Sequence, residues 1–287
     1  MKDSVRHRRT RRVVLPVAVL ILLGAAKKPD VPAPGNFWKP LPPPKTGEWL
    51  DVFPEKGQTF AEYKRSNPIR PHQLRNRIYV LPMLTKPPAD RDILQKLRGV
   101  LGAFFGLDVR ILSPKPLPKQ AYRPVGRQFE VLKLVPALRD ALPEDAVFLL
   151  AVTDRDLYLK KHGFTFGWAH FRLRVGIMST ARLGDRSDPR SLRRTLTLGL
   201  HESGHLLTLP HCVFYGCLMN GVRSVGETDR RPAVLCPVCL AKLCWATGAD
   251  PRRRYREVER AYRAAGDSGA ADQARAAADA TRLGAKG

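Results

Sequence analysis

The stretch HESGHLLTLPHC (residues 201–212) decides the fold of this chain through the spacing of its polar residues. His201 and His205 are four residues apart, which on a helix places both imidazoles on one face, where they can bind one metal ion. Glu202 stands beside them and can reach a water on that metal. A Leu-Pro pair then ends the helix, so the chain can return and supply His211 as a third ligand. Three protein ligands leave open the fourth coordination position that a catalytic zinc needs. The alternative interpretation is a core helix that happens to carry histidines and binds no metal.

The cysteines begin directly after His211. Cys212 and Cys217 form one close pair, and Cys236 and Cys239 form a second pair in CPVC, after a loop of 18 residues. Two such pairs have the spacing of a closed, tetrahedral structural zinc site. Two disulfides or buried thiols are the alternatives. Because Cys244 makes the number of cysteines odd and all five lie in one short window, the pattern favours zinc.

The order HExxHxxxxxHC, CLM, CPVC resembles the archaemetzincins, a family of zinc metallopeptidases in the metzincin group. The likeness extends over about residues 48–250. It includes GQTFAEY (57–63), NRIYVLP (76–82), VTDRDLY (152–158), FTFGWAHF (164–171) and RRPAVLCPVCLAKL (230–243). The resemblance implies a catalytic zinc on the three histidines, Glu202 as general base and Met219 in a methionine turn beneath the site. It also implies a second, structural zinc held by Cys212, Cys217, Cys236 and Cys239.

One residue departs from the metzincin pattern. Metzincins have glycine three residues after the second histidine, and this chain has Thr208 there. Glycine permits a turn with positive φ, which a β-branched residue enters only with strain. We therefore expect either a different helix ending or an altered zinc geometry.

The central part of the chain alternates apolar runs and helical patterns. Residues 77–82, 108–112 and 146–152 read as strands, and residues 90–106 and 127–141 read as helices, the second kinked at Pro136. Asp188, followed by Pro189, is a typical start for the helix that carries the histidines. These elements predict an α+β fold of the zincin or metzincin type. It would be a single domain over residues 48–265, with a mixed twisted sheet packed on helices.

The strand expected within FTFGWAHFRLR, before the zinc helix, has two interpretations. In metzincin-like folds, which this chain resembles, such a strand is a sheet edge to which a peptide substrate adds in extended form. The alternative is an ordinary edge strand that Arg172 and Arg174 protect from unwanted pairing.

The termini differ from this domain in composition. Residues 1–28 join a basic start to a 14-residue apolar run and predict a secretory signal, with Thr10-Arg11-Arg12 resembling a twin-arginine signal. An uncleaved membrane anchor is the alternative. Residues 29–47, rich in proline, predict an extended linker without a packed core. Residues 266–287 are rich in alanine and predict a mobile tail.

The predicted function is an exported or membrane-anchored zinc peptidase with two zinc ions, one catalytic and one structural, acting on a peptide or protein substrate. The formal net charge of +24 favours an anionic surface such as a membrane or a wall polymer, although a solvated surface without a partner explains it as well. The alternative function is a catalytically weak or inactive zinc-binding protein that recognises a polyanion, either nucleic acid or a wall polymer, through its basic surface. Export disfavours nucleic acid as that polyanion.

Overall fold

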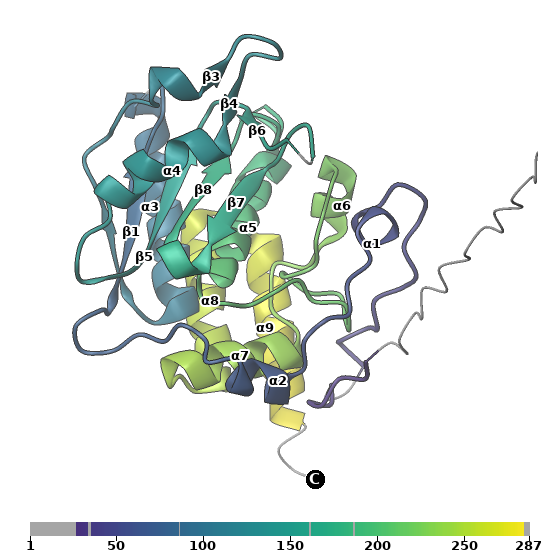
Figure 1. The fold of residues 1–287 in the computed structure, drawn as a ribbon. Helices are drawn as coiled ribbons and strands as arrows, with labels where there is room; N and C mark the ends of the chain where they lie inside the picture. Colours follow the sequence, from purple (N-terminus) through teal and green to yellow (C-terminus); the bar gives the residue numbers. More distant parts are fainter. Residues whose placement is uncertain (1–26, 34–35, 86, 161, 186, 284–287) are drawn as a thin grey trace, which may run out of the picture.

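A five-stranded sheet with the order β2-β1-β5-β8-β7 forms the centre of the protein (Figure 1). The computed structural model describes residues 27–33, 36–85, 87–160, 162–185 and 187–283. Strand β5 (Ala146–Thr153) is buried along its whole length, as expected for a continuous apolar run. It pairs in parallel with β1 (Arg77–Pro82) and β8 (Val175–Ser179), and β2 (Asp108–Ile111) pairs in parallel with β1. Strand β7 (Gly167–His170) is antiparallel to β8 and forms one edge.

The two faces of this sheet pack against different helices, because alternate side chains of a strand point to opposite faces. Phe148 and Leu150 face the core that contains α3 (Pro87–Phe105) and α5 (Pro189–Leu206). Leu149 and Ala151 face the core that contains α4 (Val131–Asp140). A small second sheet flanks α4 and consists of β3 (Tyr122–Arg123), β4 (Gln128–Glu130) and β6 (Leu157–Tyr158).

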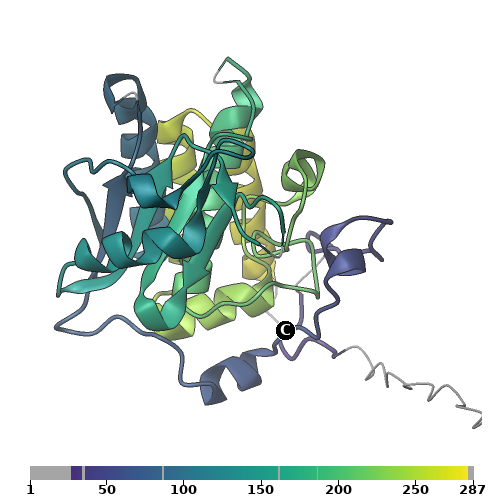
Figure 2. The same ribbon diagram turned by 45° about the horizontal axis from the view of Figure 1, so that its top comes forward.

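The remaining elements are short or lie at the ends of the chain. In the turned view of Figure 2 the two C-terminal helices lie behind the sheet, on the side away from α4. The elements are α1 (Trp49–Val52), α2 (Phe60–Arg65), η1 (Lys119–Ala121), η2 (Phe171–Leu173), α6 (Val225–Arg230), α7 (Pro237–Thr247), α8 (Pro251–Ala265) and α9 (Ser268–Leu283). The expected mixed sheet packed on helices is confirmed, including the strand over residues 77–82.

The alanine-rich C-terminal segment is not the mobile tail that its composition predicts. Residues Ser268–Leu283 form helix α9, which runs back along α8 after a turn at Gly266 (φ 88°). Ala270, Ala274 and Ala277 are fully buried in the main core. The prediction failed because it required large apolar side chains, whereas small methyl groups at helical spacing let two helices pack closely.

The proline-rich segment is also more than a linker. Trp38 is buried, and Pro40 forms a bridge to Tyr215 in the cysteine loop. The amide N–H of Leu41 donates to the carbonyl of Phe214 (3.0 Å). Extended proline-rich backbone leaves neighbouring amides and carbonyls free, and here the cysteine loop pairs with them.

The predicted export signal over residues 1–28 lies outside the described residues except for Lys27 and Lys28. Within the part of the chain that the structure describes, no helix has the length and apolarity needed to cross a membrane.

Candidate active site and metal centres

Helix α5 carries the first two histidines on one face, as the spacing predicts. The Nε2 atoms of His201 and His205 are 3.1 Å apart. The Nδ1 atom of His201 lies 3.0 Å from the carbonyl oxygen of Leu218, and that of His205 lies 2.7 Å from the carbonyl of Leu209. Each carbonyl accepts a hydrogen bond from Nδ1–H, so both Nε2 atoms present lone pairs to a common point. Burial lowers the pKa of both imidazoles, which keeps them neutral as metal ligands require.

The two ends of helix α5 are fixed by specific residues on either side of the segment that carries His201 and His205. The Asp188 carboxylate accepts from the amide of Arg190 (2.9 Å), with Pro189 at the first helical position, as predicted. At the other end, Thr208 has φ 68°. The expectation of a different helix ending is therefore wrong: threonine takes the left-handed conformation, and its Oγ1 accepts from the amide of Ile69 (3.1 Å).

His211 completes the group from beyond this turn. The ligand atoms of the three histidines all lie within 4.8 Å of one another. Glu55 fixes the third ring, because its Oε1 is 2.7 Å from His211 Nδ1 and also accepts from the Trp49 indole N–H (2.7 Å). Burial favours the neutral form of Glu55, but these hydrogen bonds outweigh it and hold the pKa of this carboxyl below its usual value. A carboxylate on the far nitrogen of a histidine orients that ligand and makes it more basic.

Glu202 lies beneath the edge strand, next to the histidines. A Cβ atom at Gly167 would lie 2.4 Å from Glu202 Cδ, so strand β7 approaches the carboxyl as closely as glycine allows. Burial raises the pKa of Glu202 to about 8, and the positive charge of Arg231 opposes this shift. A carboxyl whose proton affinity lies near neutrality can both accept and return a proton.

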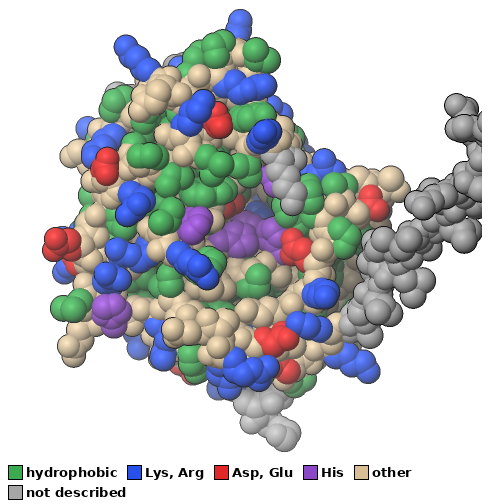
Figure 3. All heavy atoms as spheres, viewed as in Figure 1, with side chains coloured by type: hydrophobic (Ala, Val, Ile, Leu, Met, Phe, Trp, Pro, Cys, Tyr) green, Lys and Arg blue, Asp and Glu red, His purple; other side chains and the backbone are tan. Residues whose placement is uncertain are grey.

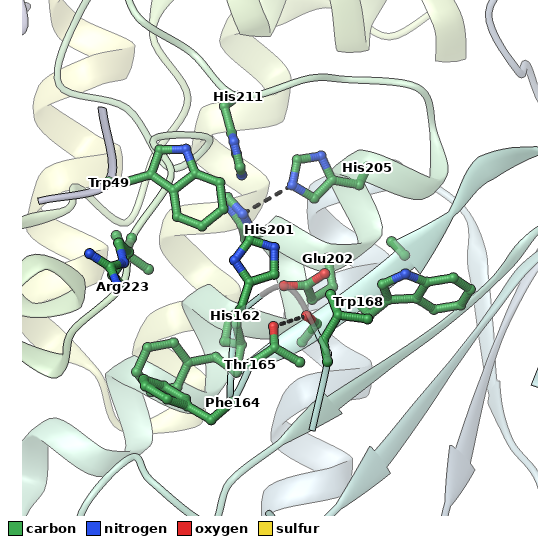
Figure 4. Close-up of a pocket in the computed structure, with 16 residues that line it drawn as sticks. Trp49, His162, Phe164, Thr165, Trp168, His201, Glu202, His205, His211 and Arg223 are labelled. Atoms are coloured by element: carbon green, nitrogen blue, oxygen red, sulfur yellow. Dashed lines mark hydrogen bonds between the residues drawn. The ribbon is translucent and has the colours of Figure 1, made fainter. Parts of the chain in front are cut away.

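These groups open onto a cavity of about 210 Å³ beside the outer edge of β7. Figure 3 shows histidines (purple) at the bottom of a hollow bordered by hydrophobic side chains. Figure 4 shows His201, His205 and His211 turned toward one another, with Glu202 below them and Trp168 of β7 to one side. The wall opposite Trp168 includes Trp49 and Arg223.

The four predicted cysteines also converge. Their sulfur atoms lie within 4.8 Å of one another, and all are buried free thiols, which excludes the two disulfides. The amides of Met219 and Cys236 lie 3.4 Å and 3.2 Å from Cys217 Sγ. Contacts with the other thiols lower the pKa of Cys212, whereas burial and the same contacts raise the pKa of Cys236 and Cys239. Cys244 does not belong to this group, and burial raises the pKa of its thiol to about 11.

The turn between the two sites links them physically. Asn220 donates from Nδ2 to the carbonyl of Cys212 (2.8 Å) and accepts from the amide of Cys217 (2.7 Å). Met219 is fully buried, and a Cβ atom at Gly204 would lie 2.6 Å from its Sδ. Met219 therefore lies against the zinc helix, as the resemblance implies.

The donor sets fit two zinc ions. Three neutral imidazoles suit a catalytic zinc, and four clustered sulfurs suit a structural one. A buried cation between the sites supports the second assignment: Arg231 is 5 % exposed, and its Nε and Nη2 have no hydrogen-bond partner among the described residues. An unpaired buried guanidinium is costly, and four thiolates around one zinc supply the net negative charge that offsets it.

Known proteins with similar sequences are metallopeptidases, in agreement with the converging histidines and cysteines. Residues 121–244 match Peptidase family M54. The archaemetzincin of Aeropyrum pernix is 34 % identical over 144 residues, which cover 48 % of this chain and 79 % of that protein. The chain belongs to the archaemetzincin family. Archaemetzincin-2 of Rattus norvegicus is 28 % identical over 267 residues, covering 78 % of this chain and 74 % of that protein.

Solved structures of archaemetzincins share the fold. The crystal structure of archaemetzincin from Methanopyrus kandleri superposes with a TM-score of 0.55 at 26 % identity, covering 61 % of this chain and 97 % of that one. A zinc-dependent peptidase from Methanocorpusculum labreanum gives 0.50 at 26 % identity, covering 58 % and 99 %. Archaemetzincins are zinc metallopeptidases, so the alternative of a polyanion-binding protein is not favoured.

The motif over residues 201–239 contains every histidine and cysteine of these groups, but it does not contain all of the residues that contact them. Glu55 and Trp49 lie more than 130 residues before the first residue of the zinc helix and belong to no spacing motif. Arg231 stands in a run of charged residues that reads as a solvated surface. The structure alone brings these residues to the metal centres.

Proposed function

We propose that this archaemetzincin hydrolyses peptide bonds, with Glu202 as general base beside a zinc ion held by His201, His205 and His211. The observation that carries the proposal is the orientation of the three imidazoles. Each Nδ1 is hydrogen-bonded to a carbonyl or a carboxylate, and each Nε2 faces the common point next to Glu202.

The chain supplies the rest of the chemistry. When bound, zinc would polarise the scissile carbonyl and lower the pKa of the water molecule that the zinc binds. Glu202 accepts a proton from the attacking water and then donates it to the leaving amine. The burial of Glu202 beneath β7 keeps bulk water from competing for that proton. Glu55 holds the His211 ring in place throughout, because its bond goes to the nitrogen that does not face the metal.

The substrate lies along strand β7 in this proposal. The strand pairs with β8 on one side, and its other side borders the cavity that contains Glu202. A peptide that adds there gains main-chain hydrogen bonds, and its side chains alternate between the cavity and solvent. Arg172 and Arg174 lie beyond the last residue of β7, so they leave this edge open.

The second zinc has a structural role in the proposal. Cys212 directly follows the ligand His211, so a closed four-cysteine site would fix the segment that returns to the catalytic zinc. We also propose export through residues 1–28, or anchoring by them, because a basic start precedes an apolar run there. An anionic membrane or wall surface suits the excess of 50 Lys and Arg over 26 Asp and Glu.

A peptide library tests the proposed function. Zinc-loaded protein should cleave a subset of peptides, with products identified by mass spectrometry. A chelator that removes the catalytic zinc should abolish cleavage, and added zinc should restore it. Cleavage that resists chelation, or a library left intact by protein with a full complement of zinc, would contradict the proposal.

A further inference from the structure

One end of the active-site cavity is closed by aromatic rings from two distant segments. Trp49 and Phe53, at and just after α1, lie with ring centroids 4.8 Å apart. His162, from the loop before β7, stacks on Trp49 at 5.8 Å and meets Phe53 edge-on at 4.9 Å. Trp49 and His162 line the cavity, and Phe53 lies in contact with both rings outside that lining. A peptide that continued past this end would have to displace these rings.

A cation stands at the same closed end. Among the described residues that line the cavity, Arg223 is the lone arginine or lysine. Its side chain is exposed and lies 5.6 Å from the centre of the Phe53 ring. One guanidinium nitrogen donates to the carbonyl of Gly47 (3.1 Å), and no ion pair in the described part of the chain involves Arg223. Its charge therefore has no carboxylate partner there.

The side chain of Glu227 connects Trp49, at the closed end of the cavity, with Arg223. The Glu227 carboxylate accepts from the amide of Trp49 (2.8 Å) through one oxygen and from the amide of Arg223 (2.9 Å) through the other. These bonds fix the backbone of both residues relative to each other. The backbone that carries the Arg223 guanidinium is therefore held in place by these hydrogen bonds.

The direction of the substrate places its carboxyl end at this wall. The loop that carries His162 leads directly into Gly167, so the closed end lies at the start of β7. Antiparallel pairing is the more stable geometry for an added strand. A peptide paired antiparallel to β7 runs toward the start of that strand, so the residues after its scissile bond approach Arg223.

The size of the cavity limits how many residues fit beyond the scissile bond. Its volume of about 210 Å³ is smaller than the roughly 300–1,000 Å³ of sites that enclose drug-sized ligands. Apolar side chains such as Phe164 and Leu198 line it. One large apolar side chain fills such a space and leaves room for little more than the end of the chain.

We infer that this enzyme removes one or two residues from the carboxyl end of peptides and that Arg223 binds the terminal carboxylate. The inference rests on the proposed peptidase function and names its substrate class: peptides with a free carboxyl end and an apolar residue near it. A guanidinium suits a carboxylate because two parallel N–H groups match its two oxygens.

Matched peptides test this inference in the wild-type enzyme. Two peptides of one sequence would carry a free carboxylate or an amide at the end. We expect kcat/KM to be about ten- to a hundredfold higher for the free acid, the size of effect that a hydrogen bond to a charged group produces. Product masses should show cleavage at the last or the second-last peptide bond.

Arg223→Gln should reduce the ratio of free-acid to amide rates toward one, with zinc content unchanged. Arg172→Gln is the matched control, because Arg172 lies in η2 beyond the far end of β7 and should leave the ratio as in wild type. Equal cleavage of both peptides, or cleavage of long peptides at interior bonds, would overturn the inference while the peptidase function stands. If zinc-loaded protein cleaves no peptide of any kind, both the proposed peptidase function and the inference about the carboxyl end are wrong.

Discussion

Replacing Gly167 by alanine tests whether Glu202 acts from its position beneath strand β7. The new Cβ would lie 2.4 Å from Cδ, 2.5 Å from Oε1 and 2.6 Å from Cγ of Glu202. Carbon atoms in contact are normally about 3.5 Å or more apart, so the carboxylate must move by about 1 Å. The backbone of Glu202 is fixed within α5, and the side chain therefore moves alone.

The displacement should affect turnover rather than folding. Misplacing a catalytic group by about 1 Å can cost on the order of a hundredfold in rate. We expect kcat for Gly167→Ala to fall by about that factor. The melting temperature and the zinc content should stay near wild type, because the three atoms nearest to the added Cβ all belong to the Glu202 side chain.

The assay compares steady-state cleavage of one peptide, zinc content and thermal unfolding. Gly99→Ala is the matched control: Gly99 lies in α3, and an added Cβ there meets no atom within 4 Å. Wild-type turnover by Gly167→Ala would refute the placement of Glu202. Loss of zinc from the variant would show that β7 presses on the histidines instead.

Three further substitutions test the surroundings of the metal centres. Glu55→Gln removes the charge that orients His211 and should weaken zinc binding at the histidine site about ten- to a hundredfold, measured by competition with a chromophoric chelator. Thr208→Gly relieves a left-handed β-branched residue but loses the bond from the Ile69 amide. Its unfolding free energy should stay within about 1 kcal/mol of wild type, and a loss of several kcal/mol in denaturant titration would contradict this. Cys236→Ser should lose one zinc and destabilise or aggregate the domain, because a closed zinc site contributes folding free energy directly. A melting temperature equal to that of wild type would exclude a structural zinc there.

The metal centres were predictable because their ligands follow local geometry. His201 and His205 meet because a helix repeats every 3.6 residues, and paired cysteines meet because short loops bring their sulfurs together. Both effects act within a few residues. The sequence around residues 201–239 therefore contains enough information to predict that these seven side chains form two groups, and the structure brings them together in those two groups.

Other features depend on packing between distant segments and could not be predicted in this way. Glu55 contacts His211 across 156 residues of sequence. Helix α9 is ordered by the fit of small side chains such as Ala274 against α8, which composition alone does not reveal. Trp38 packs into the core from a segment whose prolines suggested a free linker.

Thr208 shows a third kind of limit. The sequence correctly marked this position as unusual, because glycine is expected at a left-handed turn. It could not show that Ile69, from another segment, donates a hydrogen bond to the threonine hydroxyl (3.1 Å). The chain keeps the turn with a strained residue rather than changing the path of the helix.

The most direct test of the account is one comparison of wild type with Glu202→Gln, in which zinc per chain and peptide turnover are measured on the same samples. Glu202 is not a ligand in this account, so both proteins should contain two zinc ions and melt at similar temperatures. Turnover by the variant should fall about a hundred- to ten-thousandfold, because the proton of the attacking water has lost its acceptor. A variant that cleaves peptides at the wild-type rate, or a wild-type protein that binds fewer than two zinc ions, would contradict the account.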